Sequence, residues 1–364
     1  MARRVRVGIV GCGKIAINHA KALQANGLVD LVSCCDVDAQ RAAAFASRFG
    51  IPHSSGDLGA LLGAGVDAVT VCSPHPAHEA AVLAAADAGV HVLCEKPIAI
   101  TLEESDRMIA ATDAAGVAFG ALFQRRFWAA AQRARAAVAD GKLGVPVFGS
   151  VSLKLGRDAA YFQADPWRGT WAADGGGVLI NQAIHYIDLL QWCMGAPAVR
   201  VSGRIATRKH GDHIEVEDTA VATVEFAGGA LGVISAGTTF APGLGAQVLV
   251  TGDNGATVSI TEFPEGRPAV NDIWTVPGAE AYQQVHSTDV ESDPPMAEIH
   301  EGLTPYHALQ IDDFIAAVVE GREPAVTGRE ARKALEIVLA VYESARTGRP
   351  VALDAARTEL TVAD

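Results

Sequence analysis

A glycine-rich turn near the N-terminus directly follows an apolar run. Val5–Val10 leads into Gly11-Cys12-Gly13-Lys14-Ile15-Ala16, which has the pattern G-x-G-x-x-A. Gly11 allows a tight turn, Gly13 lets a pyrophosphate approach the backbone, and the small Ala16 lets a helix pack on the strand. The start of that helix would present N–H groups and the positive end of its dipole to phosphate. The pattern therefore predicts a dinucleotide site, although two glycines also occur in purely structural turns.

An acidic residue stands where such a cofactor would place its adenosine ribose. Asp36 follows the second apolar run, Leu28–Cys35, and lies twenty positions beyond Ala16. A carboxylate there accepts hydrogen bonds from ribose hydroxyls and repels a 2′-phosphate, so NAD is favoured over NADP. The alternative is a polar residue that simply ends a strand. Arg41 lies nearby in a predicted helix. It is either a solvated side chain or a residue that would favour NADP.

Two later strand ends carry residues that are expected at the same crevice. The strand Ala68–Cys72 is followed by Ser73 and His75, which would line the cofactor unless they only begin the next helix. The strand His91–Cys94 is followed by Lys96, one of only seven lysines beside twenty-two arginines. An ammonium at this place would hydrogen-bond a substrate hydroxyl and stabilise a developing alkoxide. The alternative for Lys96 is a solvated loop lysine.

A helix predicted at about Gly177–Met194 carries a second group of polar residues. Asn181, His185 and Asp188 fall on one stripe at spacings of four and three. The helix contains no Lys, Arg or Glu, which a stripe facing water usually carries, so we expect the stripe to face a substrate cleft. His185 is then the candidate proton acceptor, and the alternative is a structural histidine. Asp174 is the predicted N-cap.

Other residues of the second half are candidates for substrate contacts. Trp167 and Arg168 stand in a loop, where an aromatic face stacks on a sugar or nicotinamide and a guanidinium donates to oxygens. A buried loop anchor is the alternative for both. Tyr306 and His307, just before the predicted helix Ala308–Glu320, are expected to complete the pocket.

The elements that must position these residues form two predicted domains. Residues 1–123 alternate apolar runs with Ala-rich helical stretches, which predicts βαβ units, a parallel sheet and an α/β Rossmann domain that binds NAD. Residues 124–364 contain few helices and many strands, which predicts an α+β domain with an open, largely antiparallel sheet for substrate binding and oligomerisation. Residues 262–300 lack periodicity and predict a mobile loop or lid.

Composition excludes several classes of protein. The chain has 364 residues, 49% hydrophobic content and a net charge of −13, which argues against disorder and against nucleic-acid or anionic-membrane partners. No signal peptide or membrane-spanning segment is predicted. The six cysteines form no C-x-x-C pair, as is typical of reduced thiols in a cytoplasmic protein. His210 and His213 lie in a turn without a clear third ligand, so no metal site is predicted.

The motifs together resemble the glucose–fructose oxidoreductase, inositol dehydrogenase and MocA family (Gfo/Idh/MocA), over essentially the whole chain. They are the glycine turn, Ser73-Pro74-His75-Pro76-Ala77-His78, Glu95-Lys96-Pro97, Pro166-Trp167-Arg168-Gly169, Gly175-Gly176-Gly177 with Asn181, His185 and Asp188, and Glu217-Asp218-Thr219-Ala220. The resemblance implies a Rossmann domain joined to an open-faced α/β domain, a bound nicotinamide cofactor, sugar or polyol substrates, and dimers or tetramers.

The same resemblance implies roles for individual residues. Lys96 matches the active-site lysine of the family and His185 its general acid/base. The residues that match positions at the cofactor, or at the substrate near the nicotinamide, are Ser73, Pro74, His75, His78, Glu95, Lys96, Trp167 and Arg168, and Gln124 stands where many members carry Asn. Asn181 departs from the inositol dehydrogenases, which place an aspartate four residues before the histidine. An amide cannot raise the histidine pKa as a carboxylate does, but it orients the ring or bonds a substrate hydroxyl.

We therefore expect a cytoplasmic NAD-dependent dehydrogenase, a homodimer or homotetramer, that oxidises a secondary alcohol of a cyclic sugar, sugar derivative or inositol. Lys96, His185 and Asn181 would be its catalytic residues. One alternative is an NADPH-dependent reductase of a keto sugar, which a comparison of NADH with NADPH distinguishes. The other is a cofactor-binding regulator without catalysis, against which the presence of both Lys96 and His185 argues.

Overall fold

The chain divides into two compact units, which we describe separately. The computed structural model describes residues 3–283 and 293–353. Unit 1 comprises Met1–Gln124 and Thr304–Arg332, and unit 2 comprises Arg125–Leu303 and Lys333–Asp364. Residues 304–332, which the sequence analysis places in the second domain, thus pack with the first unit.

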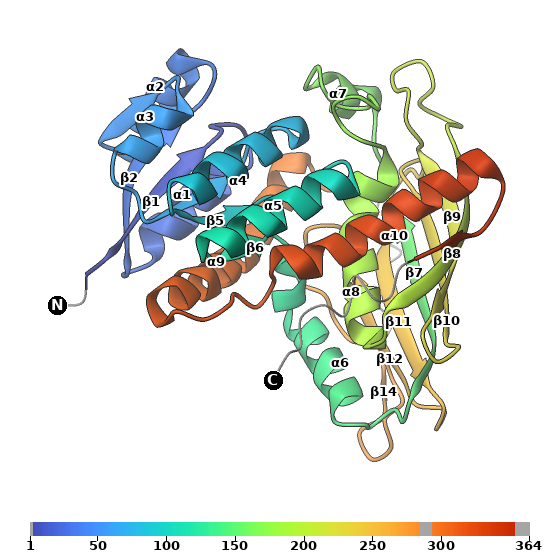
Figure 1. Cartoon of the computed structure of the whole chain (residues 1–364). Helices are drawn as coiled ribbons and strands as arrows, with labels where there is room; N and C mark the ends of the chain where they lie inside the picture. The colour runs from blue at the N-terminus through green and yellow to red at the C-terminus, as the bar shows by residue number, and fades with distance from the viewer. Residues whose placement is uncertain (1–2, 284–292, 354–364) are drawn as a thin grey trace. The chain divides into compact units, whose positions relative to one another are not determined.

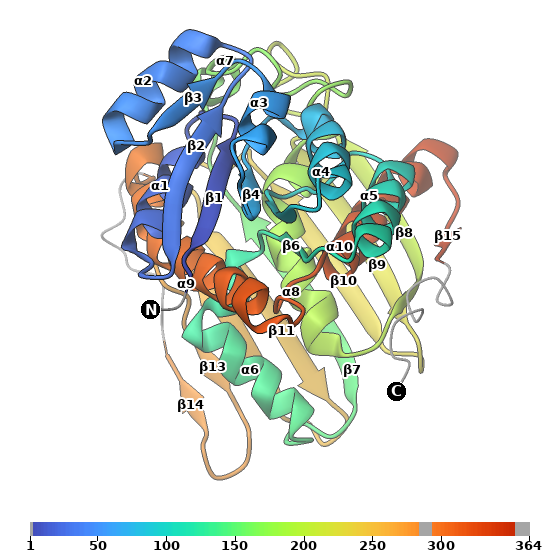
Figure 2. The same cartoon turned by 60° about the vertical axis from the view of Figure 1, so that its left-hand side comes forward.

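Unit 1 is built on a parallel six-stranded sheet in the order β3-β2-β1-β4-β5-β6. Its strands are β1 (Val5–Val10), β2 (Val29–Cys35), β3 (His53–Ser55), β4 (Ala68–Val71), β5 (His91–Cys94) and β6 (Phe119–Ala121). This strand order reverses direction between β1 and β4, and ligands of such sheets bind at the carboxyl ends of the strands there. Figure 2 shows β3, β2, β1 and β4 side by side. The predicted Rossmann architecture is confirmed.

Helices cover both faces of this sheet. They are α1 (Ala16–Ala25), α2 (Ala39–Phe49), α3 (Leu58–Gly63), α4 (His78–Asp87), α5 (Leu102–Ala115) and the end of α9 (Met296–Glu320). Val7 and Ile9 of β1 belong to a core cluster with side chains of α1, α2 and α9. Between them, a Cβ on Gly8 would lie 2.8 Å from a methyl group of Leu61 in α3, so α3 packs on the opposite face.

Unit 2 is built on a nine-stranded sheet in the order β14-β13-β12-β11-β7-β10-β9-β8-β15. The strands are β7 (Pro146–Lys154), β8 (Ala198–Ala206), β9 (Thr219–Phe226), β10 (Leu231–Gly237), β11 (Gly245–Gly252), β12 (Thr257–Glu262), β13 (Ile273–Trp274), β14 (Ala281–Tyr282) and β15 (Val351–Ala352). Only the β7–β10 pair is parallel among the described pairs, so the predicted antiparallel character is confirmed.

Helices of unit 2 cover one face of this sheet (Figures 1 and 2). They are α6 (Ala129–Ala139), α8 (Ile184–Met194) and the last part of α10 (Gly328–Thr347), and the short α7 (Ala159–Gln163) lies in a loop. A Cβ on Gly149 of β7 would meet Leu190 of α8 at 2.5 Å, and one on Gly203 of β8 would meet Val341 of α10 at 2.7 Å. The absence of a side chain at these two glycines lets the helices approach the strands closely.

The segment predicted as a mobile loop or lid contains regular structure. Within residues 262–300 lie β13, β14 and the start of α9, while residues 284–292 fall outside the described part. The α9 helix begins at Met296 and continues through Pro305, so the predicted start at Ala308 is wrong. Tyr306 and His307 therefore lie inside a helix rather than just before one.

Two further expectations concern the whole chain. All six cysteines are buried and form no disulfide. In the described residues, no helix has the length and apolar character needed to cross a membrane.

Candidate active site

The glycine turn after β1 has the geometry that its sequence predicts. Gly11 adopts φ +88°, and a Cβ there would lie 2.7 Å from the backbone nitrogen of Ser73, so only glycine fits. A Cβ on Gly13 would meet no atom within 4 Å, which leaves open space beside its backbone. The α1 helix begins at Ala16, and no side chain of the described residues caps it. Its N-terminal N–H groups can thus serve a phosphate group.

Asp36, directly after β2, supports this turn. Its Oδ2 accepts the N–H of Cys12 at 2.9 Å and its Oδ1 accepts the N–H of Asp38 at 2.9 Å. The guanidinium of Arg41 lies 3.3 Å from Oδ1, and this arginine side chain is half exposed. A carboxylate has about four acceptor positions, so Asp36 retains capacity for ribose hydroxyls while it holds the turn. Arg41 thus lies beside Asp36 and is also exposed to solvent, so both interpretations of this residue stay open.

Two predicted cofactor residues carry buried polar atoms that fit a nicotinamide dinucleotide. Ser73 Oγ and Gln124 Oε1 are buried and have no hydrogen-bond partner among the described residues. Ribose hydroxyls and a carboxamide group would supply donors and acceptors to such atoms. Pro74 precedes a 3₁₀ turn, His75–Ala77, and the His75 ring packs edge-on against His78 at 5.8 Å. The residues of unit 1 therefore fit the cofactor.

The loop after β5 is held in place by buried histidines. Glu95 is buried, its Oε1 lies 2.9 Å from His19 Nε2, and its Oε2 accepts the N–H of Lys96 at 3.2 Å. His78 is fully buried, with Nδ1 2.9 Å from the carbonyl oxygen of Pro97 and Nε2 2.8 Å from that of Ser73. Both His78 nitrogens are thus used within the protein, which links the loops after β4 and β5. Burial lowers the pKa of His78, and these carbonyl groups partly offset the effect.

The two residues of α9 predicted to contact substrate differ in their surroundings. His307 is buried in unit 1, and its Nε2 lies 3.8 Å from Glu95 Oε1. Tyr306 is half-buried. The structure therefore places His307 beside the carboxylate that precedes Lys96, which neither the spacing nor the composition of the sequence indicated.

The helix of unit 2 that carries His185 begins with an irregular turn. Residues Leu179–Ala183 form a π-helix that leads into α8, and such turns are frequent at functional sites. His185 is buried, whereas Asn181 is half-buried. The Asn181 amide donates to Asp174 Oδ1 at 2.7 Å, so the amide is held in a fixed orientation.

The N-terminus of this helical segment is capped by Glu217 and not by Asp174. Glu217 accepts the N–H of Gly177 at 2.8 Å and that of Leu179 at 2.9 Å, and the hydroxyl of Tyr342 donates to it at 2.9 Å. Burial raises the pKa of Glu217 to about 7, although these hydrogen bonds oppose the shift. Asp174 instead accepts the N–H of Gly169, so the predicted N-cap is wrong. Sequence reasoning missed this role of Glu217.

The predicted polar stripe does not extend to Asp188. The Asp188 carboxylate is 1% exposed and accepts two hydrogen bonds from Arg126, at 2.7 Å and 2.6 Å. Nearly every residue of α8 is buried, which explains why it lacks Lys, Arg and Glu. The expectation that all three polar residues face a substrate cleft is therefore wrong for Asp188, which is half of a buried ion pair.

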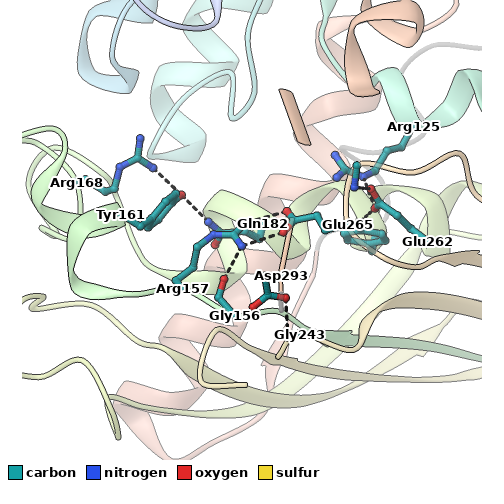
Figure 3. A network of polar contacts seen from close by, with 12 residues as sticks. Arg125, Gly156, Arg157, Tyr161, Arg168, Gln182, Gly243, Glu262, Glu265 and Asp293 are labelled. Carbon is teal, nitrogen blue, oxygen red and sulfur yellow. Dashed lines mark hydrogen bonds and ion pairs between the residues drawn. The ribbon is translucent and has the colours of Figure 1, made fainter. Parts of the chain in front are cut away.

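Arg168 belongs to a polar network that Figure 3 shows from close by. Its guanidinium donates to the Tyr161 hydroxyl at 2.6 Å. It also lies 4.9 Å from the centre of the Trp167 ring. Gln182 donates to the same hydroxyl at 2.8 Å, which connects this loop with the π-helix that carries Asn181. Tyr161 was not predicted. Its ring and its hydroxyl both contact Arg168, one of the two predicted substrate contacts.

His210, in the turn between β8 and β9, has structural partners. The backbone N–H of His210 donates to Asp218 at 3.0 Å, and its ring lies 4.9 Å from that of Phe162. Among residues 3–283 and 293–353, no group of three His, Cys, Asp or Glu residues is arranged to hold a metal ion.

Both halves of the chain match known protein families. Residues 5–123 match the NAD-binding Rossmann fold of the Gfo/Idh/MocA oxidoreductases, and residues 135–353 match their C-terminal alpha/beta domain. The chain is 31% identical to 1,5-anhydro-D-fructose reductase of Ensifer adhaerens, over 96% of this chain and 98% of that protein. It is 29% identical to D-apiose dehydrogenase of Paraburkholderia graminis, over 98% and 92%.

Solved structures give the same picture. The WlbA dehydrogenase of Bordetella pertussis, crystallised with NADH and UDP-GlcNAcA, is 31% identical to this chain and has a TM-score of 0.83. The match covers 97% of this chain and 99% of that chain.

Proposed function

Because the chain belongs to the Gfo/Idh/MocA oxidoreductase family, we propose that it oxidises a secondary alcohol of a cyclic sugar, sugar derivative or inositol with NAD. One observation supports this most strongly. In unit 1, predicted functional residues follow the carboxyl ends of five parallel strands: Gly11 after β1, Asp36 after β2, Ser73 after β4, Lys96 after β5 and Gln124 after β6. That edge of a doubly wound sheet is where dinucleotides bind.

Each proposed residue has a role that its chemistry permits. Bound NAD supplies the hydride acceptor that the oxidation requires. The Lys96 ammonium hydrogen-bonds the reacting oxygen and offsets its negative charge. His185 takes the hydroxyl proton, and Asn181, held by its bond to Asp174, orients substrate or imidazole. Trp167 and Arg168 hold the ring of the substrate.

The substrate class is supported by the relatives. The two curated relatives above are named for D-apiose and for an anhydro-fructose, and the solved structure contains a nucleotide sugar. All three names refer to sugars or sugar derivatives. For this chain we propose the substrate class and no single substrate.

The test combines a substrate panel with one variant. Sugars, inositols and nucleotide sugars are incubated with the chain and NAD, and absorbance of reduced nicotinamide is followed. Lys96→Ala should lower turnover about a hundredfold or more while NAD binding, measured by calorimetry, is retained. Lys142→Ala is the control, because this lysine is half exposed and pairs with Asp140. No reduction of NAD by any compound, or near-normal turnover of Lys96→Ala, overturns the proposal.

One contact supports a second candidate function, the reduction of a keto sugar with NADPH. Arg41 lies beside Asp36, and a guanidinium there is a potential partner for the 2′-phosphate of NADPH. The chain would then reduce a keto sugar. A strong preference for NADPH over NADH, lost in Arg41→Ala, would establish this candidate in place of the first.

We also propose that the protein is a cytoplasmic homodimer or homotetramer. One face of the large sheet exposes Phe148, Val221, Leu231 and Val233, which lie on neighbouring strands β7, β9 and β10. Such an apolar patch favours association. Leu231→Glu should therefore lower the mass measured by analytical ultracentrifugation, and an unchanged mass contradicts this surface. The buried, unbridged cysteines support the cytoplasmic location.

A further inference from the structure

Three buried histidines surround the Glu95-Lys96-Pro97 loop, and the proposed reaction uses none of them as a proton donor or acceptor. His19 of α1 and His307 of α9 lie beside Glu95 Oε1, at 2.9 Å and 3.8 Å. Their rings are 6.0 Å apart, and they are 0% and 2% exposed. His78 holds the other end of the loop through the carbonyl oxygen of Pro97. These contacts all lie within unit 1.

The carboxylate at the centre of this cluster requires such partners. A buried ion without a counter-charge is costly, so Glu95 needs a cation or a proton. Burial raises the pKa of Glu95, but His19, His307 and Lys96 together lower it to about 2. Burial lowers the pKa of His19, but the neighbouring Cys72 and Glu95 raise it to about 10. At neutral pH the two groups therefore form an ion pair.

The other titratable groups near the pair do not replace either partner. Burial raises the pKa of the Cys94 thiol well above its usual value, so this thiol stays neutral. Burial lowers the pKa of His78, and the carbonyl groups of Ser73 and Pro97 together with Glu95 oppose that shift. Cys72 acts in the same direction as Glu95, because its sulfur also raises the pKa of His19 and so supports the charged ring. The ion pair next to Lys96 is formed by Glu95 and His19, with His307 beside the same carboxylate oxygen.

We infer that His19, Glu95 and His307 form a buried charged frame that positions Lys96 and sets the electrostatic field at its ammonium group. Glu95 Oε2 fixes the backbone of Lys96 through its N–H, while Oε1 is committed to the histidines. His19 offsets the negative charge that Lys96 would otherwise face. This inference rests on the proposed role of Lys96, and it makes His19, Glu95 and His307 positioning residues rather than catalytic ones.

The frame predicts that the titration midpoint of Lys96 rises in one variant and returns in a second. His19→Gln removes the nearest partner of Glu95 and leaves His307 at 3.8 Å, so the carboxylate acts more strongly on Lys96. The Lys96 ammonium should then hold its proton to a pH about one unit higher. In the double variant with Glu95→Gln this carboxylate is gone, and the titration midpoint should return to the wild-type value or fall below it. A histidine that only fills space would produce no shift that depends on Glu95.

The experiment measures Lys96 directly. The full chain, without cofactor, is reductively dimethylated with ¹³C, which keeps the lysine charge, and the methyl resonances are titrated by NMR. Lys96→Arg assigns the Lys96 signal, and the Lys142 signal is the internal control. His91→Asn is the matched control variant, because His91 stands at the other end of β5 and accepts the N–H of Ala118.

The outcomes separate the frame from the proposed reaction. An upward shift in His19→Gln that the second substitution abolishes supports the frame, even if no sugar is oxidised. No shift, or an equal shift in the single and double variants, overturns it. If His19→Gln does not fold, His307→Gln is titrated with the same expectation. Where a substrate is found, the alkaline limb of the kcat profile should move upward in His19→Gln together with the NMR midpoint.

Discussion

Removal of the Asp188 carboxylate should strongly destabilise unit 2. Its two oxygens accept from Arg126 at 2.7 Å and 2.6 Å, and the two side chains are 1% and 3% exposed. Asp188→Asn keeps the shape but leaves the guanidinium buried without a counter-charge. Breaking a buried pair from one side costs about 3–5 kcal/mol. At about 1.4 kcal/mol per tenfold, the folding equilibrium constant of this unit should fall a hundredfold or more.

The tryptophans provide a probe that is specific for this unit. All five tryptophans of the chain lie between residues 128 and 274, which belong to unit 2. Urea denaturation followed by tryptophan fluorescence therefore reports on unit 2 even if unit 1 unfolds separately. The matched control is Glu343→Gln, which removes an exposed i, i+3 pair with Arg346 on α10 and should leave the transition unchanged.

The result that would refute this reasoning is specific. If Asp188→Asn lowers the unfolding free energy by less than about 1 kcal/mol, the pair behaves like a surface salt bridge and the burial argument fails. The double variant Arg126→Met/Asp188→Leu removes both charges and should recover most of the loss. A double variant as unstable as the single one would also contradict the argument.

Three further outcomes follow from particular contacts. Asn181→Asp places a carboxylate where the amide now donates to Asp174 at 2.7 Å. Two carboxylates this close share a proton, so unit 2 of this variant should be less stable at alkaline than at mildly acidic pH. Urea denaturation followed by tryptophan fluorescence measures the difference. Burial lowers the pKa of His19, but Cys72 and Glu95 raise it from 6.5 to about 10. The stability that protonated His19 contributes to the fold is therefore complete below pH 6.5 and is lost as pH rises through about 10. The advantage of wild type over His19→Gln in hydrogen exchange of α1 should shrink across that interval. Gly177→Ala puts a Cβ 1.8 Å from the Glu217 carbonyl oxygen, so its urea midpoint should fall markedly.

Helix limits were predictable where the sequence carries its own caps. The Asp38 side chain accepts the N–H groups of Gln40 and Arg41, so α2 begins at Ala39. Thr101 and Glu104 form a reciprocal capping box at the start of α5. These signals lie within a few residues of the helix they begin, and for that reason a single sequence shows them.

The start of α9 was not predictable in this way. The predicted helix begins at Ala308, three residues after Pro305. In the structure Ile299 and Leu303 are buried at a helical spacing, so tertiary packing extends the helix upstream of the proline. Tertiary contacts here override the local preference of proline.

The candidate site shows the same limit at the level of side chains. The positions of Asp36 and Lys96 follow from strand ends, which the sequence reveals. The roles of Glu95 and Asp188 depend on partners 76 and 62 residues away, which no spacing within one element indicates. Glu217 likewise caps a helical segment some forty residues earlier in the chain.

A buried ion pair adjoins each residue proposed to handle charge. Glu95 pairs with His19 next to Lys96, and Asp188 pairs with Arg126 one turn beyond His185. Apolar side chains of similar volume often give equal or greater stability than buried pairs, so stability alone does not account for them. We infer that these pairs fix the orientation of the neighbouring residues, because a buried pair is stable only in a narrow range of geometry. The double variant Arg126→Met/Asp188→Leu should therefore remain folded but turn over its substrate at least about tenfold more slowly, since a small misplacement of a reacting group is costly. Full turnover in a stable double variant would show that the pair does not position His185.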